Sequence, residues 1–507
     1  MKDLKFNYKL LMFTTLIISG CSIVYELLIS AVGSYLLGDS IKQFSITIGL
    51  YMCAMGFGSH ISKYIKKDLF DFFVFVEIAV GIIGGISSLV LFLSNAYIAS
   101  NEFIMYIQII FIGTLVGLEI PILTRIIEEN CDNLRVTLSN VFSFDYIGGL
   151  IGSLAFPLFL LPTLGYFSTS FLVGAINIII SIVIIHNYSN YIKNINIFKT
   201  IAYIAVVIMF LGIVFSENIS RSIENSLYRD RVVLTTQTKY QKIVMTKHKD
   251  DLRLYLNGNI QFSSKDEYRY HEALVHIPMS VSKSHENILI LGGGDGLAVR
   301  ELLKYNDVKK ITLVDIDDEM VNICKTNELV KEINNNSLSN RKVELVYEDA
   351  FKFLENTKEV YNVIIVDLPD PNNDSLNKLY TNIFYRLCKN VLVQDGVMTV
   401  QSTSPYYAKN AFWSINKTLK SEDFNVYPYH VQVPSFGDWG FNLCSKDDID
   451  ISNINVKVDT KFLNKDSINS IFNFGEDEKI DINKIDTNTL SHPKLINYYE
   501  ESVKNWK

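Results

Sequence analysis

The stretch Ile288-Leu-Ile-Leu-Gly-Gly-Gly-Asp-Gly-Leu-Ala-Val-Arg-Glu-Leu302 decides the fold of the second half of the chain. Its apolar start predicts a buried parallel strand, its glycines and Asp295 predict a turn, and a helical pattern begins near Leu297. Glycine lets the backbone approach a ligand closely at the carboxyl edge of such a sheet. A second strand pattern, 310–317, carries Asp315 about twenty residues later, where nucleotide-binding βαβ units place a ribose-binding carboxylate.

The turn differs from the dinucleotide fingerprint G-x-G-x-x-G, because Leu297 stands where the third glycine belongs. Asp295 inside the turn would repel a pyrophosphate, and it suits a cationic ligand such as a sulfonium nucleoside. A glycine-rich turn alone is typical of any Rossmann-like domain. The stretch therefore predicts the fold and the charge of the ligand, but it does not identify a reaction.

Strand and helix patterns alternate beyond this turn, which predicts a parallel sheet with helices on both faces. The strand patterns lie at 288–291, 311–315, 343–347, 361–366 and 395–401. Upstream, shorter strand patterns at 241–246, 252–256 and 260–262 are joined by polar turns, among them Asn257-Gly258. Asn-Gly between such patterns is a strong hairpin signal, so a small β domain precedes the sheet.

The first part of the chain is much more apolar than the rest. Seven stretches are long enough to cross a bilayer, which takes about 20 apolar residues each. We place these spans at 8–30, 41–62, 72–95, 103–124, 139–162, 166–187 and 199–217. A lipoprotein signal cleaved before Cys21 is an alternative for the first of them, but the apolar run continues through Ile29 and favours a span.

The loops after the second, fourth and sixth spans carry most of the positive charge: Lys63, Lys66, Lys67, Arg125, Arg135 and Lys193. Positive charge marks the cytoplasmic side. We therefore expect a multi-pass protein of the cell membrane whose second half is cytoplasmic, although Lys2, Lys5 and Lys9 count against this orientation.

The expected organisation has four parts. An N-terminal multi-span α-helical membrane domain covers 1–220, and a small β-hairpin domain covers 230–285. A Rossmann-like, methyltransferase-like doubly wound α/β domain covers 286–447, and a polar C-terminal tail covers 448–507. The net charge of −7 over 507 residues gives no sign of nucleic-acid binding, and the six scattered cysteines indicate neither a disulfide framework nor a metal site.

The segment Asp367-Leu-Pro-Asp370-Pro371 follows the strand pattern at 361–366. Together with the Gly-Gly-Gly-Asp-Gly turn, it resembles the spermidine synthase (polyamine aminopropyltransferase) family, whose hallmarks are GGGDG and D-x-x-D-P. The resemblance covers roughly 230–445. Further family-like elements occur in the same order upstream: Tyr240-Gln241, 256–261, Asp266-Glu267 and Tyr270-His271-Glu272.

Other segments are similar to the membrane-embedded branch of that family: Val24-Tyr-Glu-Leu27, 117–121, Phe144-Asp-Tyr146, Asn488-Thr-Leu490 and Tyr498-Tyr499. The resemblance implies transfer of an aminopropyl group from decarboxylated S-adenosylmethionine to an amine, usually putrescine, with release of methylthioadenosine. It implies no cofactor beyond this co-substrate, and it implies a homo-oligomer, either a dimer or a tetramer.

The resemblance also implies a role for each matching residue. Asp367 matches the proton acceptor and Asp370 the acid that grips the diamine, while Asp295 should meet the aminopropyl ammonium. The remaining matches are Asp315 for the ribose, Asp349 with Ala350 for the adenine, Gln241 for the nucleoside, His271 for the polyamine, and Tyr380 for the pocket wall. Paired carboxylates in one pocket raise one another's pKa, which makes a better base.

Some positions depart from the family pattern. Asp315 replaces the usual glutamate and Ala350 the usual glycine, and Phe436 and Trp439 stand where soluble members often have a tyrosine; these departures leave the acceptor amine open. Two residues have structural roles as alternatives to ligand binding: Asp317 could cap a helix, and His271 could be a histidine packed in the core. Two other functions remain open: a polyamine transporter or sensor whose nucleotide domain only binds, and a methyltransferase that uses intact S-adenosylmethionine.

Acidic residues occur inside the predicted spans, namely Glu26, Glu77, Glu119 and Asp145. An ionisable group at the bilayer centre costs about 2.5–3.5 kcal/mol or more, and such groups commonly mark a cation path. We hypothesise that the spans bind a polyamine through Glu26, Glu119 and Asp145. The alternative is that these acids pair with tyrosines, Arg125 or backbone groups and only hold the helices together.

Overall fold

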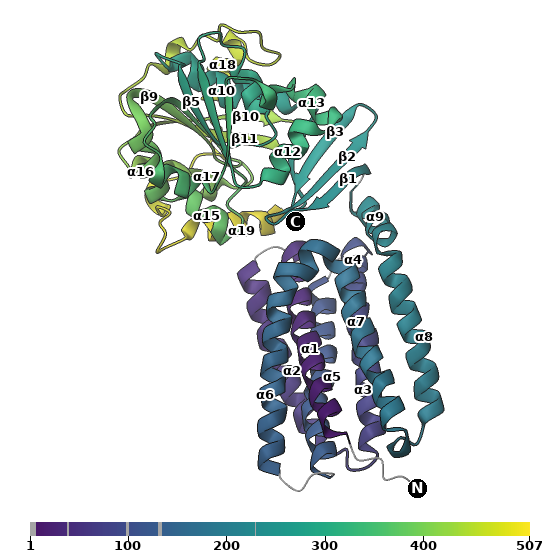
Figure 1. Cartoon of the computed structure of the whole chain (residues 1–507). Coiled ribbons are helices and arrows are strands. Elements are labelled where there is room, and N and C mark those ends of the chain that lie inside the picture. The colour runs from purple at the N-terminus through teal and green to yellow at the C-terminus, as the bar shows by residue number, and fades with distance from the viewer. Residues whose placement is uncertain (1–6, 38–39, 98–100, 130–133, 229, 507) are drawn as a thin grey trace. The chain divides into compact units, whose positions relative to one another are not determined.

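The computed structural model describes residues 7–506 except 38–39, 98–100, 130–133 and 229, so Lys2 and Lys5 lie outside the described residues. The chain divides into two compact units, Met1–Arg229 and Asp230–Lys507. Figure 1 shows the first as a bundle of long helices and the second as strands with surrounding helices. They are called here the helical unit and the sheet unit.

The helical unit is built from α1 (Tyr8–Leu37), α2 (Ser40–Ser62), α3 (Leu69–Gly85), α4 (Ser87–Tyr97), α5 (Asn101–Glu128), α6 (Leu134–Ala155), the π-helix η1 (Phe156–Leu160), α7 (Leu161–Asn187), α8 (Ile195–Val214) and α9 (Ser216–Leu227). Among the described residues, six helices are long and apolar enough to cross a membrane.

The seven predicted spans correspond to six helices because α6, η1 and α7 run together. Arg135–Asn187 is one apolar segment of 53 residues, and it is interrupted at Gly165, where φ is 69° and ψ is −173°. A straight helix of that length would extend for about 80 Å, whereas a bilayer core is about 30 Å thick. The break therefore separates the two predicted spans 139–162 and 166–187.

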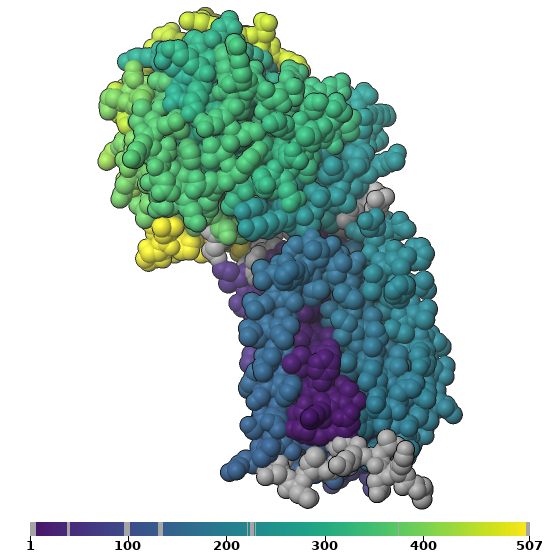
Figure 2. All heavy atoms as spheres, in the orientation of Figure 1, coloured from purple at the N-terminus to yellow at the C-terminus, as the bar shows by residue number. Residues whose placement is uncertain are grey.

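The outer surface of the helical unit is apolar. Phe57, Phe111, Phe159 and Phe210 come from different helices, and each is more than half exposed. Figure 2 shows α1, in purple, as a strip between the side chains of later helices, and Tyr25, Leu28 and other α1 side chains are buried. Extensive exposed apolar surface is unfavourable in water and suits contact with an apolar partner such as lipid.

The sheet unit begins with a four-stranded antiparallel sheet in chain order, β1 (Arg231–Gln237), β2 (Lys242–His248), β3 (Asp251–Leu256) and β4 (Asn259–Ser263). The sequence predicted the last three strands. The first strand, β1, was not among the predicted strand patterns.

A seven-stranded sheet follows, in the order β10-β11-β9-β8-β5-β6-β7. Its parallel strands are β5 (Asn287–Gly292), β6 (Lys310–Asp315), β7 (Val343–Tyr347), β8 (Tyr361–Asp367) and β9 (Leu392–Gln401); the antiparallel strands are β10 (Asn425–Val433) and β11 (Gly437–Ser445). The prediction of a Rossmann-like parallel sheet is therefore confirmed, and the antiparallel pair extends it.

Helices cover both faces of this sheet. They are α10 (Glu267–Val281), α11 (Leu297–Leu302), α12 (Asp318–Thr326), α13 (Glu328–Asn334), α14 (Ala350–Asn356), α15 (Asp374–Asn377), α16 (Asn382–Val391) and α17 (Lys409–Lys420). Ile288 and Ile290 of β5 pack into one hydrophobic layer, and Leu289 and Leu291 pack into the other. Burial on both faces explains why this strand is apolar throughout.

The C-terminal segment is part of the sheet unit. Its helices are α18 (Lys465–Ile471) and α19 (Lys494–Trp506). Ile468 and Ile471 are buried in one hydrophobic layer of the unit, and Leu495 is buried in the other. Although 448–507 is polar overall, a few buried apolar side chains attach this segment to the rest of the sheet unit.

Candidate active site

The glycine turn after β5 lies directly against the ends of β6 and β8. Gly292 has a φ of 84°, and a Cβ placed on it would come within 2.1 Å of the carbonyl oxygen of Asp367. A Cβ on Gly294 would come within 2.5 Å of Asp315 Oδ2. Glycine is needed at both positions because the turn gathers Asp295, Asp315 and Asp367 at one edge of the sheet.

Asp367 and Asp370 each accept a hydrogen bond from a tyrosine. Tyr270 Oη donates to Asp367 Oδ1 at 2.6 Å, and Tyr499 Oη donates to Asp370 Oδ2 at 2.8 Å. Asp370 Oδ1 is buried and forms no hydrogen bond of normal geometry among the described residues, although the side chains of Gln401 and Thr403 lie close enough to lower the pKa of this carboxyl. A buried carboxylate oxygen without a donor is costly, so this atom is suited to accept a hydrogen bond from a bound ammonium group.

The acids at this edge have raised pKa values. Burial and the negative charge of Asp295 raise the pKa of Asp367 to about 6, against the opposing effect of His271. Burial raises the pKa of Asp370 to about 6 and that of Asp315 to about 7, and it also raises the pKa of Asp295. A carboxylate with a pKa near 6 is a stronger base than an ordinary aspartate and is still mostly ionised at neutral pH.

His271 is buried and anchored within its own helix, α10. Its Nδ1 lies 2.8 Å from the carbonyl oxygen and 2.9 Å from Oε2 of Glu267, and Arg300 donates to both carboxylate oxygens of Glu267. Burial lowers the pKa of His271, but the hydrogen bond and charge of Glu267 outweigh it and raise that pKa to about 9. The positive charge of this ring balances part of the negative charge of the acids.

Gln241 is brought beside Asp315 through Asp317. Gln241 Nε2 and Thr238 Oγ1 donate to Asp317 Oδ2 at 2.8 and 2.7 Å, and the Asp317 N–H donates to Asp315 Oδ1 at 2.9 Å. Asp317 also caps α12, since its Oδ1 accepts from the N–H of Met320. The capping role predicted for Asp317 is confirmed, and the same side chain connects the small sheet to the end of β6.

Asp349 has a different environment from the four acids above. Its Oδ1 caps α14 by accepting from the N–H groups of Phe351 and Lys352, and its Oδ2 forms a 2.5 Å ion pair with Lys378. Ala350 is the buried first residue of α14. The carboxylate predicted to contact adenine is thus engaged by a lysine that the sequence did not single out.

Tyr380 supports the loop that carries Asp370. Its hydroxyl donates to the carbonyl oxygen of Pro369 at 3.0 Å and accepts from Gln401 Nε2 at 2.6 Å. Gln401 Nε2 also lies 2.5 Å from the carbonyl oxygen of Leu368. Tyr380 is fully buried, so its polar atom contacts the loop backbone and serves to fix the position of the two acids.

Aromatic rings surround Tyr270 beside these acids. The ring centroids of Phe436, Trp439 and Phe441 lie 5.9, 6.5 and 5.2 Å from that of Tyr270. Phe436 and Trp439 are the residues that depart from the soluble members. They place apolar surface around the tyrosine that donates to Asp367.

The C-terminal segment reaches this site, which the sequence did not predict. Tyr499 lies on α19, and the amide of Asn488 before that helix donates to the carbonyl oxygen of Tyr380 at 3.1 Å. The signal was present in the phrases Asn488-Thr-Leu490 and Tyr498-Tyr499, but their distance along the chain from Asp370 hid the contact.

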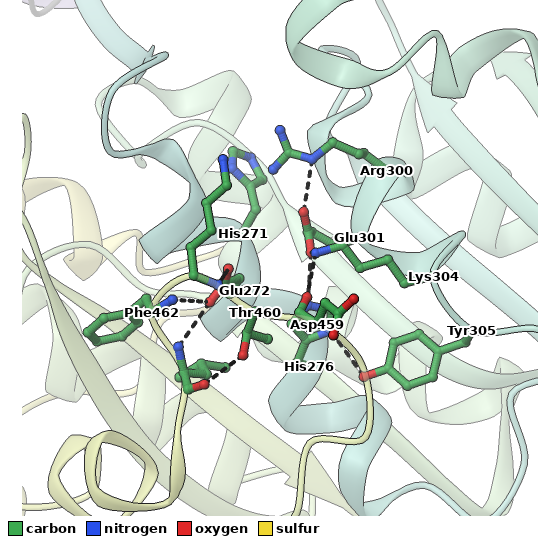
Figure 3. A network of polar contacts seen from close by, with 12 residues as sticks. His271, Glu272, His276, Arg300, Glu301, Lys304, Tyr305, Asp459, Thr460 and Phe462 are labelled. Carbon is green, nitrogen blue, oxygen red and sulfur yellow. Dashed lines mark hydrogen bonds and ion pairs between the residues drawn. The ribbon is translucent and has the colours of Figure 1, made fainter.

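A network of buried polar contacts lies around α10, next to His271 (Figure 3). Glu272 accepts the backbone N–H groups of Lys461, Phe462 and Leu463 at 2.6, 2.9 and 3.0 Å. Glu301 is bonded by His276 at 2.9 Å, and by Arg300 and Lys304. The helix that carries Tyr270 and His271 is therefore tied to α11 and to the C-terminal segment.

One further cluster outside this site has metal-ligand residue types. The ligand atoms of His430, Asp438 and Glu478 lie within 4.8 Å of one another. His430 Nδ1 is 2.7 Å from Asp438 Oδ1, and its Nε2 is 2.9 Å from the carbonyl oxygen of Asn473. With Nδ1 facing Asp438 and Nε2 facing a backbone carbonyl oxygen, the arrangement is that of an imidazolium paired with a carboxylate.

Comparison with known proteins places this geometry in context. A family model described as "Spermine/spermidine synthase domain" matches residues 267–457. The polyamine aminopropyltransferase of Oceanobacillus iheyensis is 41% identical over 98% of this chain and 98% of its own length. That of Leptospira interrogans is also 41% identical, over 96% of this chain and 97% of its own.

A solved spermidine synthase, in complex with the transition-state analogue AdoDATO, is 26% identical and covers 48% of this chain and 86% of its own, with a TM-score of 0.46. The assignment rests on the two relatives that align along nearly the whole chain, across both units. They confirm the resemblance that the Gly-Gly-Gly-Asp-Gly turn and the Asp367–Pro371 segment indicated: the chain belongs to the polyamine aminopropyltransferase family.

Proposed function

We propose that this enzyme transfers the aminopropyl group of decarboxylated S-adenosylmethionine to putrescine, with Asp367 as the proton acceptor. Membership of the family supports the reaction. The observation that carries the residue assignment is the gathering of Asp295, Asp315 and Asp367 at one glycine turn, with Asp370 three residues beyond Asp367 and aromatic rings around Tyr270. Two cationic substrates require this combination of carboxylates and apolar surface.

The chemistry follows from the state of each substrate. Putrescine is protonated at neutral pH, so one ammonium must first give its proton to Asp367. The freed nitrogen lone pair then forms a bond to the methylene carbon beside the sulfonium. The carbon–sulfur bond breaks, and its electron pair neutralises the sulfur to give methylthioadenosine. The sulfonium already activates this carbon, so the enzyme supplies orientation and a base.

The other acids would hold the substrates in line for this step. Asp370, with its partnerless Oδ1, would accept from the far ammonium of putrescine. Asp295 would accept from the ammonium of the aminopropyl group. Asp315 and Gln241, joined through Asp317, lie together at the end of β6 and would bind the ribose.

The two alternative functions are less consistent with these residues. A methyltransferase would place the carboxylate of intact S-adenosylmethionine near Asp295, which would repel it. A domain that only binds polyamines needs no base, yet Asp367 has a pKa raised to about 6 by burial and by Asp295. Both features favour turnover of the decarboxylated donor.

A direct assay tests the proposal. Purified full-length protein is incubated with decarboxylated S-adenosylmethionine and with putrescine, cadaverine or spermidine, and the products are identified by mass spectrometry. We expect spermidine and methylthioadenosine in equal amounts with putrescine. Methylated amine from intact S-adenosylmethionine, or no product with any acceptor, would contradict the proposal.

We also propose that the helical unit is a multi-pass domain of the cell membrane and that the sheet unit lies on the cytoplasmic side. The length of the apolar helices, the exposed phenylalanines and the basic loops support this. Fusion of green fluorescent protein or alkaline phosphatase after the last residue tests the orientation. A fluorescent fusion and an inactive phosphatase are expected, whereas an active phosphatase would reverse the topology.

A further inference from the structure

The core of the helical unit contains a group of buried polar side chains from four helices. Tyr25 of α1, Glu77 of α3, Glu119 of α5 and Asn177 of α7 are each no more than 3% exposed. We call these four residues the inner cluster. Each lies well inside its own helix, away from both ends, so the cluster occupies the interior of the bundle.

The members of the inner cluster interact with one another, but one polar atom of each has no hydrogen-bond partner among the described residues. Asn177 Nδ2 donates weakly to Glu77 Oε2 at 3.4 Å, and Glu119 and Tyr25 interact electrostatically with Glu77. Four atoms have no hydrogen-bond partner among the described residues: Tyr25 Oη, Glu77 Oε1, Glu119 Oε1 and Asn177 Oδ1. Three of these atoms are acceptors in an ionised carboxylate or an amide, and only the tyrosine hydroxyl can also donate, so the cluster has fewer donors than acceptors.

No positive side chain of the described part of the helical unit compensates the two glutamates. Arg125, on the same helix as Glu119, donates instead to the backbone carbonyl oxygens of Pro121, Ser62 and Ile65. The alternative in which Arg125 pairs with one of the acids is therefore not observed among the described residues. Two carboxylates in an apolar interior cannot both remain ionised without a cation.

The structure also changes which acids belong together. The sequence hypothesis joined Glu119 with Glu26 and Asp145, but these two are only partly buried. Glu77, which the sequence hypothesis did not include, is fully buried beside Asn177. Glu77 and Glu119 are thus the pair that lacks a counter-ion.

We propose that the inner cluster is a binding site for a polyamine, distinct from the site in the sheet unit. The ammonium groups of a polyamine carry positive charge and only donate hydrogen bonds, which matches two carboxylates and an amide oxygen without donors. The methylene chain between those groups suits the apolar side chains of the bundle. The tyrosine hydroxyl supplies a fourth polar contact.

Counting bound ligand per chain tests this proposal without reference to turnover. Full-length protein in nanodiscs is equilibrated with radiolabelled spermidine in the absence of the aminopropyl donor. We expect two sites per chain in the parent, and one in the Asp367→Asn/Asp370→Asn variant, which retains the inner cluster. One site is also expected in Glu77→Gln/Glu119→Gln, and none when all four substitutions are combined.

Glu102→Gln is the matched control, since Glu102 is an exposed glutamate near the start of the helix that carries Glu119, and it should keep two sites. If Asp367→Asn/Asp370→Asn binds no spermidine, the inner cluster is not a polyamine site, and this result holds even if the glutamine variants fail to fold. If sodium ions at the same concentration as spermidine displaced the spermidine that remains bound to Asp367→Asn/Asp370→Asn, the inner cluster would be a general cation site and not a polyamine site. Failure of the parent to transfer the aminopropyl group in a separate assay would contradict the function proposed for the sheet unit, and it would not affect this count of binding sites.

Discussion

At the residue scale, the acids of the active site differ in what already contacts them. Asp367 and Asp370 hold tyrosine hydroxyls, whereas Asp295 accepts a hydrogen bond from the N–H of Leu297 inside the glycine turn. That position makes Asp295 the residue that should distinguish the two forms of the donor, because intact S-adenosylmethionine has a carboxylate that the decarboxylated form lacks.

We expect Asp295→Asn to bring the two dissociation constants closer together by about tenfold or more, which corresponds to about 1.4 kcal/mol. The reason is that the substitution removes the charge that repels the extra carboxylate. Calorimetric titration of parent and variant with both compounds measures this. Unchanged discrimination would show that another group rejects intact S-adenosylmethionine and would reopen the methyltransferase alternative.

Asp370 should make stability depend on pH. Burial raises its pKa from an ordinary value of 3.8 to about 6 in the folded protein, so folding favours the protonated form. Its contribution to the free energy of unfolding is fully present below pH 3.8 and is lost as the pH rises through 6. Asp370→Asn should therefore raise the melting temperature of the sheet unit at pH 8, by about 2–4 °C for roughly 1 kcal/mol, and not at pH 4.

Differential scanning fluorimetry of the full-length protein across this pH range provides the measurement. Asp395→Asn, at an exposed position, is the control and should follow the parent at every pH. The raised pKa would be contradicted if the melting temperature of Asp370→Asn equalled that of the parent at pH 8. It would also be contradicted if the gain in melting temperature over the parent were smaller at pH 8 than at pH 4.

Residues that act through a neighbour were the hardest to predict. The motif Tyr270-His271-Glu272 drew attention to His271, but Tyr270 is the member that contacts Asp367, and Glu272 is the one that holds the C-terminal segment. Lys378 carried no signal at all. A lone lysine in a loop is ordinary, and only the fold places it beside Asp349.

At the scale of elements, α19 is the clearest addition to the site. It lies beyond the matched family domain, which ends at residue 457, yet its Tyr499 contacts the acid that should grip the diamine. Asn488 and Leu495 attach this helix to the sheet. The C-terminal helix is therefore expected to affect acceptor binding.

We expect Tyr499→Phe to raise KM for putrescine by about tenfold, since a hydrogen bond to a charged group contributes about 1.5–3 kcal/mol. KM for the donor should stay unchanged. Tyr498→Phe is a matched control because the hydroxyl of the neighbouring tyrosine contacts Asp486. Steady-state kinetics with each substrate varied in turn provide the test, and equal effects of the two variants would mean that α19 only stabilises the unit.

The strands show how far local pattern carries. Five parallel strands were predicted from short strand patterns that alternate with helix patterns, and in β5 the apolar run is buried on both faces. Strands β10 and β11 were not predicted, and β10 contains Pro428, a residue type that is unfavourable in the interior of a sheet. It is tolerated because β10 is the edge strand of the seven. Similarly, Gly165 interrupts the long apolar segment at a position that hydropathy alone shows only as a boundary.

At the scale of the whole molecule, the two units have one chemical feature in common. Each gathers buried carboxyl groups that lack a complete set of donors: Asp370 in the sheet unit, and Glu77 with Glu119 in the helical unit. The relatives that align across both units indicate that this pairing of units belongs to the family rather than to this chain alone. Polyamines are the cations that both groups suit.

The central claim is that Asp367 accepts the proton in aminopropyl transfer, and single-turnover kinetics of Asp367→Asn test it most directly. Enzyme in excess over labelled donor is mixed with putrescine, and donor affinity is measured in parallel by calorimetry. We expect the rate to fall by about 10²–10⁴-fold, the usual cost of losing a positioned base, while donor affinity is retained. A fall of about threefold or less would be far smaller than this range and would show that Asp367 is not the proton acceptor.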